Sequence, residues 1–492
     1  MIVYVENKNQ LIKFTAMRRD TIFYFALIFL TSACGNRKEQ AEDETMSSGP
    51  NIIYILADDL GYGDLGCYGQ KDIRTPFLDR MAEEGMRFTN HYAGSTVSAP
   101  SRCALMTGRH MGHAYIRGNG APPLPAEKVT VAELLKNAGY KTGLIGKWGL
   151  GEKNSSGHPM NQGFDLFVGY LNQIRAHNSY PAWMWSNRDT MHLDNEVKII
   201  PETYAKGIGG VATEKNTHSH DVFMREATQF INANRDTSFF LYLALTIPHA
   251  NNEAGYWDMI GMETPDMMGY DTTEWPGTQQ AHASMISYMD RDIGELLDQL
   301  EKLGIDDNTL VIFTSDNGPH KEGGADPAFF DSWGPLRGFK RDLYEGGIRV
   351  PMIAWWPGKI EAGTTSGHIS AFWDFLPTAC EVAEAETPGN IDGISFLPEL
   401  LGQQQKKHDH LYWEINIGGG RQAARKGKWK AIRYNVSEAP EKPVELYDLS
   451  KDIGETNNVA DQYPEVSKDM FQLMKHARVK PSVENFMFEF EK

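Results

Sequence analysis

Residues 51–59 read NIIYILADD, and this stretch decides the fold class of the chain. Residues 51–57 form a short apolar run rich in strand-favouring types, which is typical of a buried strand in a parallel sheet. The run ends at Asp58 and Asp59. Two adjacent carboxylates at the end of a buried strand are costly unless they are neutralised. A hard divalent cation with oxygen ligands would neutralise them, and an Asp-rich turn is the plainer alternative.

Outward from this stretch, further strands alternate with helices. We expect strands at residues 141–145, 239–247, 308–314 and 350–356, and helices at 75–82, 129–139, 221–234 and 281–303. This alternation indicates an α/β fold with a doubly wound, mostly parallel sheet, whose ligands gather at the carboxyl ends of its strands.

Past about Gln403 the pattern changes to shorter strands. We expect these at residues 410–415, 421–426, 429–434 and 445–449, with a closing helix at 464–479. They predict a smaller C-terminal α+β subdomain built on an antiparallel sheet. The expected boundaries are residues 51–402 for the catalytic domain and 403–492 for the subdomain.

Composition narrows the class of function. The chain has 492 residues, of which 41% are hydrophobic, so a large core is available. The formal net charge of −17 argues against nucleic acid as a partner. It does not exclude an anionic substrate, because local cations can dominate a pocket. The four cysteines show neither a disulfide framework nor a pair spaced as metal ligands.

The N-terminal segment has the features of a bacterial export signal. Residues 17–19 read MRR and precede an apolar run at 21–30 that is too short to span a bilayer. Residues 30–34 read LTSAC and resemble a lipobox. We therefore expect a lipoprotein signal peptide over residues 1–34, a lipid on Cys34 that anchors the exported protein to the outer membrane (periplasm or cell surface), and a flexible tether over 35–50. A secretory signal cleaved nearby is the alternative.

Residues 94–109 read GSTVSAPSRCALMTGR and hold the candidate nucleophile. Pro100 suits the first turn of a helix, so we expect Ser98 just before the helix N-terminus. Backbone N–H groups and the helix dipole favour an anion there, and Arg102 can point back toward it. A serine that caps an ordinary helix is the simpler interpretation.

The order Ser-x-Pro-Ser-Arg, then Leu-x-Thr-Gly-Arg, resembles the motif of formylglycine-dependent sulfatases in the alkaline-phosphatase-like superfamily. Bacterial arylsulfatases and N-acetylgalactosamine-6-sulfatase-like enzymes are the most similar members. The resemblance implies that a maturation enzyme oxidises Ser98 to formylglycine. A plain serine could take a sulfuryl group but would release it poorly. The hydrated aldehyde carries two hydroxyls, one to attack sulfur and one to drive elimination of sulfate.

The resemblance extends to the other polar clusters of the chain. Residues 315–318 (SDNG), 146–151 (GKWGLG), the Pro-His that follows the strand at 239–247, and 336–351 (LRGFKRDLYEGGIRVP) match further family motifs. The implied calcium ligands are Asp58, Asp59, Asp316, Asn317 and the modified Ser98. The implied residues around the sulfate are Arg102, Lys147, His249 and Lys340.

The chain departs from the family pattern at Gly149, where the family has a histidine that contacts the formylglycine hydrate. We expect His177 to replace this histidine. It lies in residues 173–185 (QIRAHNSYPAWMW), which we interpret as an irregular loop. His177 could instead bind the sugar, and Arg175 and His113 are weaker candidates. The tryptophans of this segment fit either a sugar site or a cluster that holds the loop in place.

The implied activity is hydrolysis of sulfate esters on a host or algal glycan. Two alternatives remain: a phosphate-ester hydrolase of the same superfamily, and an inactive relative that binds glycans. Two lysines directed at sulfate and a single implied metal argue against the first. Retention of every matched position except Gly149 argues against the second.

Overall fold

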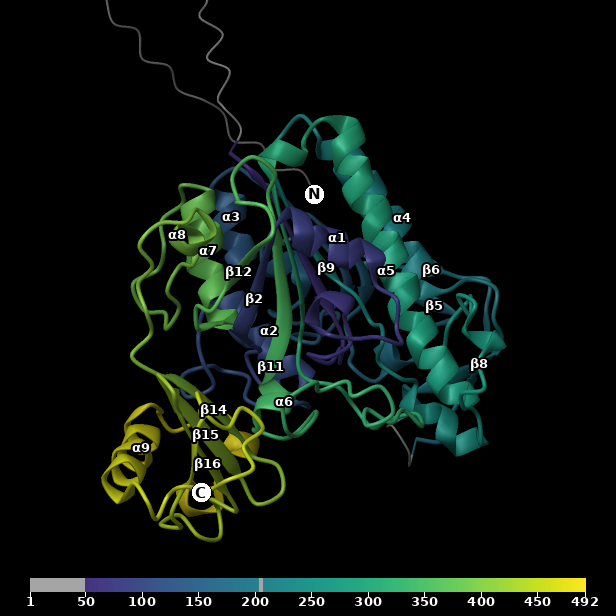
Figure 1. Cartoon of the computed structure of the whole chain (residues 1–492). Coiled ribbons are helices and arrows are strands. Elements are labelled where there is room, and N and C mark those ends of the chain that lie inside the picture. The colour runs from purple at the N-terminus through teal and green to yellow at the C-terminus, as the bar shows by residue number, and fades with distance from the viewer. Residues whose placement is uncertain (1–48, 203–206) are drawn as a thin grey trace, which may run out of the picture. The chain divides into compact units, whose positions relative to one another are not determined.

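A mixed sheet of eleven strands forms the centre of the larger part of the described structure (Figure 1). The structure is a computed structural model that describes residues 49–202 and 207–492. The strand order is β12-β2-β11-β10-β1-β9-β3-β4-β5-β6, with β13 beside β2. The strands are β1 (Asn51–Ala57), β2 (Met86–Tyr92), β3 (Lys141–Lys147), β4 (Leu166–Tyr170), β5 (Trp183–Ser186), β6 (Asp189–His192), β9 (Phe239–Ala244), β10 (Thr309–Ser315), β11 (Arg349–Trp355), β12 (Thr364–Ser366) and β13 (Ser370–Ala371).

The centre of the sheet is parallel and the flanks are partly antiparallel. β1 pairs with β10 on one side and with β9 on the other, and β3 lies between β9 and β4, all in parallel register. β11 runs antiparallel to both β10 and β2. The carboxyl ends of five neighbouring strands therefore meet at one edge, which is where polar residues can converge.

Helices cover both faces of this sheet. The helices are α1 (Pro76–Glu84), α2 (Ser98–Thr107), α3 (Val131–Asn137), α4 (Ser219–Asn234), α5 (Gly277–Leu303), α6 (Glu345–Ile348), α7 (Phe375–Val382), α8 (Leu397–Leu400) and α9 (Pro464–His476). Because side chains alternate along a strand, Ile52 and Tyr54 of β1 pack with α2, α3 and α7, whereas Ile53 and Ile55 pack with α1, α4 and α5. Figure 1 shows these two groups of helices on opposite sides of the sheet.

Two smaller sheets complete the described structure. β14 (Leu411–Ile415), β15 (Arg421–Lys426), β16 (Trp429–Tyr434) and β17 (Glu445–Asp448) form an antiparallel meander against which α9 packs. β7 (Glu196–Ile199) and β8 (Gly210–Glu214) form a separate antiparallel pair. The doubly wound sheet and the C-terminal antiparallel sheet are thus both present as expected.

One expected element is wrong. The segment at residues 173–185, interpreted as an irregular loop, ends in strand β5, which pairs with β4 and extends the sheet beyond its parallel centre. Its first turn is a short 3₁₀ helix, η3 (Arg175–His177). Aromatic residues with polar neighbours fit a strand as well as a loop, and the pairing of β5 with β4 on one side and with β6 on the other makes this segment a strand.

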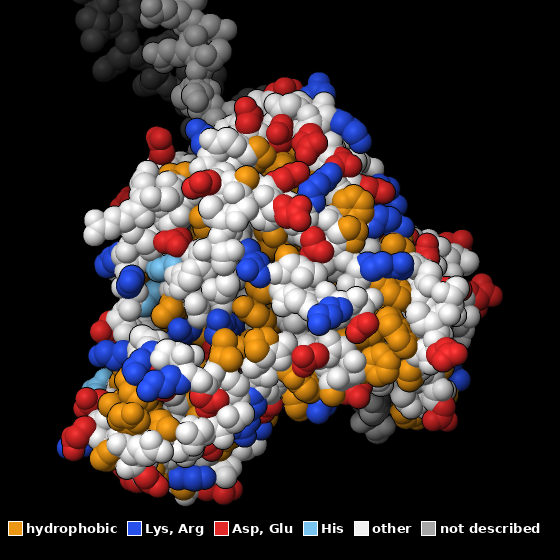
Figure 2. Space-filling model, viewed as in Figure 1, with side chains coloured by type: hydrophobic (Ala, Val, Ile, Leu, Met, Phe, Trp, Pro, Cys, Tyr) orange, Lys and Arg blue, Asp and Glu red, His pale blue; other side chains and the backbone are white. Residues whose placement is uncertain are grey.

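The expectations for the N-terminal segment lie outside the described residues, since the signal peptide, Cys34 and nearly all of the tether fall within residues 1–48. Among the described helices, none is both long and apolar enough to cross a bilayer. Cys67, Cys103 and Cys380 are free thiols. On the face shown in Figure 2, acidic and basic side chains are interspersed over all the elements in view.

Candidate active site

The site begins where β1 and β10 end. Asp58 and Asp59 follow β1, and Asp316 and Asn317 follow β10, its parallel neighbour. All four side chains are fully buried. The backbone N–H of Asp59 donates to Asp316 Oδ1 at 3.1 Å, and Asn317 Nδ2 donates to Asp59 Oδ1 at 2.6 Å. The four predicted metal ligands therefore form one cluster.

This cluster fits a hard cation. Its candidate ligand atoms are carboxylate and amide oxygens, the type that calcium prefers. Asn317 Oδ1 is buried and has no hydrogen-bond partner among the described residues, so one oxygen lacks the contact that burial requires. Burial, and the nearby charge of Asp58, raise the pKa of Asp316. The fit therefore rests on the oxygen donor set and on the buried ligand oxygen that has no partner among the described residues.

Ser98 lies at the start of α2, where it faces this cluster. The helix begins at Ser98 itself, with Val97 as its N-cap, so the expected position just before the helix was wrong by one residue. Ser98 Oγ donates to Asp58 Oδ1 at 3.2 Å and accepts from Lys147 Nζ at 3.3 Å. The candidate nucleophile is thus held between a carboxylate and a cation.

Arg102 is one turn after Ser98 on the same helix. Its Nε and Nη2 donate to Asp316 Oδ2 at 3.2 and 2.8 Å, and its Nη1 donates to the carbonyl of Lys147 at 2.7 Å. The guanidinium is fully buried, and Nη2 is 3.7 Å from Asp58 Oδ2. Arg102 therefore ties the helix to the ends of β10 and β3 and balances two carboxylates.

Two lysines approach the cluster from different segments. Lys147, the last residue of β3, donates to Asp58 Oδ2 at 2.6 Å. Lys340 donates to Asp59 Oδ2 at 2.8 Å and to Glu322 Oε2 at 2.8 Å. Burial opposes the charge of Lys340, but Asp59 and Glu322 outweigh it and raise its pKa, so the ammonium stays protonated.

His249 follows β9 and is oriented by its own backbone neighbour. Its Nδ1 donates to the carbonyl of Ala250 at 2.7 Å, so Nε2 carries the lone pair and accepts from Lys340 Nζ at 3.0 Å. Burial, then the charge of Lys340, hold its pKa well below the usual value. The neutral ring is sandwiched between His177 at 4.7 Å and His320 at 5.7 Å, measured between ring centroids.

His177 reaches the same pocket, as the sequence predicted, but its setting was not foreseen. Its Nδ1 is 3.0 Å from Glu253 Oε2, and the Glu253 side chain is almost completely buried. Glu253 lies in a 3₁₀ helix, η5 (Asn252–Trp257), four residues after His249. No motif of the sequence pointed to Glu253, because the pairing depends on how two loops fold together.

The position at Gly149 is filled by another side chain. Gly149 has φ +82°, a conformation that favours glycine, and a Cβ built there would be 1.7 Å from Nε2 of Gln173. That nitrogen is buried and has no partner among the described residues. Gln173, and not His177, thus occupies the place next to Gly149, while His177 packs against His249.

These residues line one cavity of about 400 Å³. Ser98, Lys147, Gly149, His177, His249 and Lys340 all contribute to its wall, together with Glu322 and Arg341. Asp58, Asp59, Arg102, Asp316 and Asn317 lie behind this wall as buried partners of Ser98, Lys147 and Lys340. The sequence did not single out Glu322, although it follows the SDNG motif by four residues.

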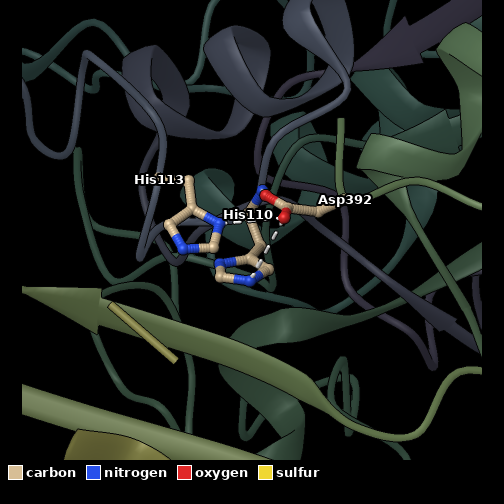
Figure 3. A group of neighbouring side chains, drawn as sticks. All are labelled: His110, His113 and Asp392. Carbon is tan, nitrogen blue, oxygen red and sulfur yellow. Dashed lines mark hydrogen bonds and ion pairs between the residues drawn. The ribbon is translucent and has the colours of Figure 1, made fainter. Parts of the chain in front are cut away.

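A second cluster of possible metal ligands lies elsewhere (Figure 3). His113 Nδ1 is 2.8 Å from Asp392 Oδ1, and His110 Nε2 is 3.7 Å from the same oxygen. The backbone N–H of Gly112 donates to His110 Nδ1 at 3.0 Å, so the proton of the neutral ring is on Nε2, which faces Asp392. A metal would need that nitrogen unprotonated. The cluster therefore fits a clasp between two loops better than a metal site.

Solved structures share this architecture. Ps i-CgsB in complex with k-i-k-neocarrahexaose aligns with a TM-score of 0.71 and 29% identity, covering 88% of this chain and 94% of that one. A structure from work on glycosaminoglycan metabolism by Bacteroides thetaiotaomicron aligns with a TM-score of 0.70 and 29% identity, covering 87% and 99%. Fold and site together define an ester hydrolase of the alkaline-phosphatase-like class.

Sequence comparison defines the family within that class. The Sulfatase family model matches residues 50–385, and the N-sulphoglucosamine sulphohydrolase C-terminal model matches residues 337–480. The N-acetylgalactosamine-6-O-sulfatase of Bacteroides thetaiotaomicron is 31% identical, over 92% of this chain and 98% of that protein. Human arylsulfatase A is 34% identical, over 86% and 87%. The chain belongs to the sulfatase family and is a sulfuric ester hydrolase.

Proposed function

We propose that this sulfatase removes O-sulfate groups from a glycan, using a formylglycine made from Ser98 and a calcium ion. The observation that carries the proposal is the setting of Ser98 Oγ, 3.2 Å from Asp58 and 3.3 Å from Lys147 at the wall of the cavity. A hydroxyl held between an acceptor and a cation can approach an anionic ester that the same cation binds.

Calcium would be held by oxygens of Asp58, Asp59, Asp316, Asn317 and the modified Ser98. When bound, it would supply positive charge that polarises the sulfate ester and favours ionisation of the nucleophile. The fit rests on the oxygen donor set and on the unpartnered Asn317 Oδ1. Formylglycine, as its hydrate, would supply one hydroxyl to attack sulfur and a second to expel sulfate.

The chain's own residues would then bind and orient the ester. Lys147 is paired with Asp58, and Lys340 is paired with Asp59. Their ammonium groups can therefore contact different oxygens of one sulfate. As the S–O bond to the sugar breaks, its electron pair passes to the departing sugar oxygen, which takes up a proton, while the preformed cations hold the charged sulfuryl group in place. Arg102 keeps the carboxylates in place without reaching the cavity wall itself.

His249 and His177 are the groups suited to proton transfer. His249 Nε2 faces Lys340 with its lone pair, and His177 stacks on it while its Nδ1 contacts the buried carboxylate of Glu253. The carboxylate of Glu253 accepts a hydrogen bond from the proton-bearing Nδ1 of His177, which fixes the tautomer and leaves Nε2 with its lone pair. We assign His177 to proton transfer in place of the histidine absent at Gly149.

A sulfated carbohydrate fits the cavity and the relatives. The volume of about 400 Å³ falls in the range of small-molecule sites. One relative is named an N-acetylgalactosamine-6-O-sulfatase, and one structural neighbour was solved with a carrageenan oligosaccharide. A lipid on Cys34, which would hold the exported protein at the outer membrane, would place this cavity where extracellular glycans arrive.

The mass of the Ser98 peptide tests the proposal. Conversion of serine to formylglycine removes two hydrogens, so the peptide from a host with the maturation enzyme should be about 2 Da lighter than the unmodified one. The same chain made without that enzyme should keep serine and lose nearly all turnover. Full activity with unmodified Ser98 would refute the proposal. Turnover of a phosphate ester in preference to its matched sulfate ester would favour the phosphatase alternative.

The role of His177 is tested by His177→Ala on two substrates. Loss of a proton carrier should lower kcat about 10²–10⁴-fold on both a small aryl sulfate and a sulfated glycan. Loss of a sugar contact should mostly raise KM for the glycan and spare the aryl sulfate. Glu253→Gln, which keeps the shape of the partner but loses its charge, should lower kcat on both substrates in the same direction as His177→Ala. Intact turnover of His177→Ala on both substrates would disprove the assignment.

A further inference from the structure

Arg341 is a cation of the cavity wall to which the proposed reaction assigns no task. It follows Lys340 directly, but the two side chains differ in their settings: Lys340 is almost completely buried against Asp59, whereas the Arg341 side chain is 47% exposed. Among the described residues that line the cavity, the lysines and arginines are Lys147, Lys340 and Arg341. Lys147 is paired with Asp58 and Lys340 with Asp59, so Arg341 is the one of these three cations that is not paired with either carboxylate.

The backbone holds Arg341 in a fixed and uncommon conformation. Its φ is +79°, in the left-handed region that favours glycine. Its N–H donates to the carbonyl of Thr96 at 3.0 Å, and its own carbonyl accepts from Arg421 Nη1. Thr96 is two residues before Ser98, so Arg341 is tied to the segment that carries the nucleophile. A glycine would suit this backbone better, so the arginine side chain itself needs an explanation.

Glu322 directs the guanidinium toward the cavity. One oxygen of Glu322 accepts from Lys340 at 2.8 Å, and the other accepts from Arg341 Nη2. Burial would raise the pKa of Glu322, but Lys340 and then Arg341 hold it well below the usual value, so the carboxylate stays charged. An arginine has five N–H donors in a planar fork. The contact with Glu322 uses one nitrogen of the Arg341 side chain, which leaves donors for a ligand.

The surroundings of Arg341 are more positive than the chain as a whole. The net charge of the chain is −17, yet Lys321, beside Glu322, lies over the Phe339 ring at 4.1 Å. Arg421 contacts the Arg341 carbonyl and is 3.3 Å from Asp342. Lys321, Arg341 and Arg421 thus come from three segments, and the carboxylates of Glu322 and Asp342 offset part of their charge.

We infer that Arg341 binds a second anionic group of the substrate, either a sulfate or a carboxylate, while the first sulfate lies at Ser98. Arginine suits this task because its fork can donate two parallel hydrogen bonds to either group. The inference rests on the proposed glycan substrate and adds a preference: sugars that carry two acidic groups should bind better than those that carry one.

Binding of defined disaccharides tests this inference without turnover. The protein with unmodified Ser98 would be titrated by calorimetry with three matched ligands: a monosulfated disaccharide, the same disaccharide with a second sulfate, and a monosulfated disaccharide containing a uronate. Arg341→Gly removes the side chain at a position whose φ suits glycine, so its thermal unfolding should stay close to that of the parent protein. Arg341→Lys keeps the charge but loses the fork. Arg235→Ala removes an exposed arginine that is paired with Asp236 outside the cavity, and serves as the matched control.

We expect the parent protein to bind at least one of the two diacidic ligands about tenfold more tightly than the monosulfated ligand, as a charge-assisted contact would give. The diacidic ligand that binds more tightly shows whether the second group is sulfate or carboxylate. Arg341→Gly should abolish the preference, Arg341→Lys should reduce it, and Arg235→Ala should retain it. Equal affinities in the parent protein, or a preference that survives Arg341→Gly, would overturn the inference while leaving the proposed function intact. Failure of every sulfated disaccharide to bind would overturn both.

Discussion

Lys430 of β16 carries a buried charge that joins the C-terminal sheet to the catalytic part, and replacing it should be strongly destabilising. Its Nζ is 2.8 Å from Glu345 Oε1 and 3.0 Å from Glu455 Oε1, and all three side chains are fully buried. Glu345, which belongs to a sulfatase motif, also accepts from Arg349 at 3.1 Å. Glu345 and Arg349 thus belong to a buried network of ion pairs. Lys430→Met keeps the length of the side chain and removes only the charge and its hydrogen bonds.

The expected cost follows from these contacts. Breaking a buried ion pair by removing one partner costs about 3–5 kcal/mol, because a charge is left buried without compensation. We expect the lower end of this range for Lys430→Met, because Arg349 still pairs with Glu345 in that variant. Glu455 can also take up a proton: burial raises its pKa to about 7, against 4.5 for an ordinary glutamate, while Lys430 lowers it. We therefore expect a loss of about 3 kcal/mol in the free energy of unfolding at neutral pH.

The pH dependence has a definite sign. A carboxyl whose pKa is raised on folding contributes stability that is complete below pH 4.5 and is lost as the pH rises through 7. Removing Lys430 raises the pKa of Glu455 further and extends this loss to higher pH. The destabilisation by Lys430→Met should thus be larger at pH 8 than at pH 6, by about 1 kcal/mol if the pKa rises by one unit.

Urea unfolding followed by tryptophan fluorescence at pH 6 and pH 8 measures both effects. Lys428→Met is the matched control, because Lys428 is about half exposed and pairs with Asp448 at the surface. Its loss should change stability only slightly. A cost for Lys430→Met no larger than that of the control, or a smaller cost at pH 8 than at pH 6, would refute the reasoning.

Four further predictions concern single positions. Asp316→Ala should nearly abolish turnover by removing a calcium ligand. Chelation should do the same to the parent enzyme, and added calcium should restore the activity of the parent enzyme but not that of Asp316→Ala. Activity that survives exhaustive chelation would count against the calcium site. Cys34→Ala should release the protein from the membrane fraction or block its processing, and a mature N-terminus well beyond Cys34 would exclude the lipid anchor. Gly149→Ala should lower the free energy of unfolding in urea by about 1–2 kcal/mol, because alanine is strained at φ +82°. Shortening Gln173 in the same chain should not restore this stability. Full restoration would show that the clash of the new Cβ with Gln173 dominates over the backbone strain. Asp392→Asn should lower the melting temperature by weakening the clasp with His110 and His113, whereas a rise in the parent's melting temperature on adding zinc that depends on Asp392 would show a metal site instead.

Much of the site could be predicted from the sequence because it depends on local order along the chain. A buried strand followed directly by Asp58 and Asp59, and another followed by Asp316 and Asn317, place carboxylates at strand ends whatever the rest of the fold does. In a parallel sheet these ends lie on one edge, so the cluster follows from topology. Ser98 and Arg102, four residues apart, share a helix face for an equally local reason.

Tertiary structure alone decided what surrounds these groups. Glu253 meets His177, Glu322 meets Lys340 and Arg341, and Gln173 fills the space beside Gly149, and each contact joins loops that sequence spacing does not relate. Segment 183–186 is strand β5 because it pairs with β4 on one side and with β6 on the other. The sequence by itself determined the strands that lead to Asp58, Lys147 and Asp316 and the helix that carries Ser98. The packing of loops over those ends determined which side chains reach the substrate, because loop conformation depends on contacts distant in the chain and not on local propensity.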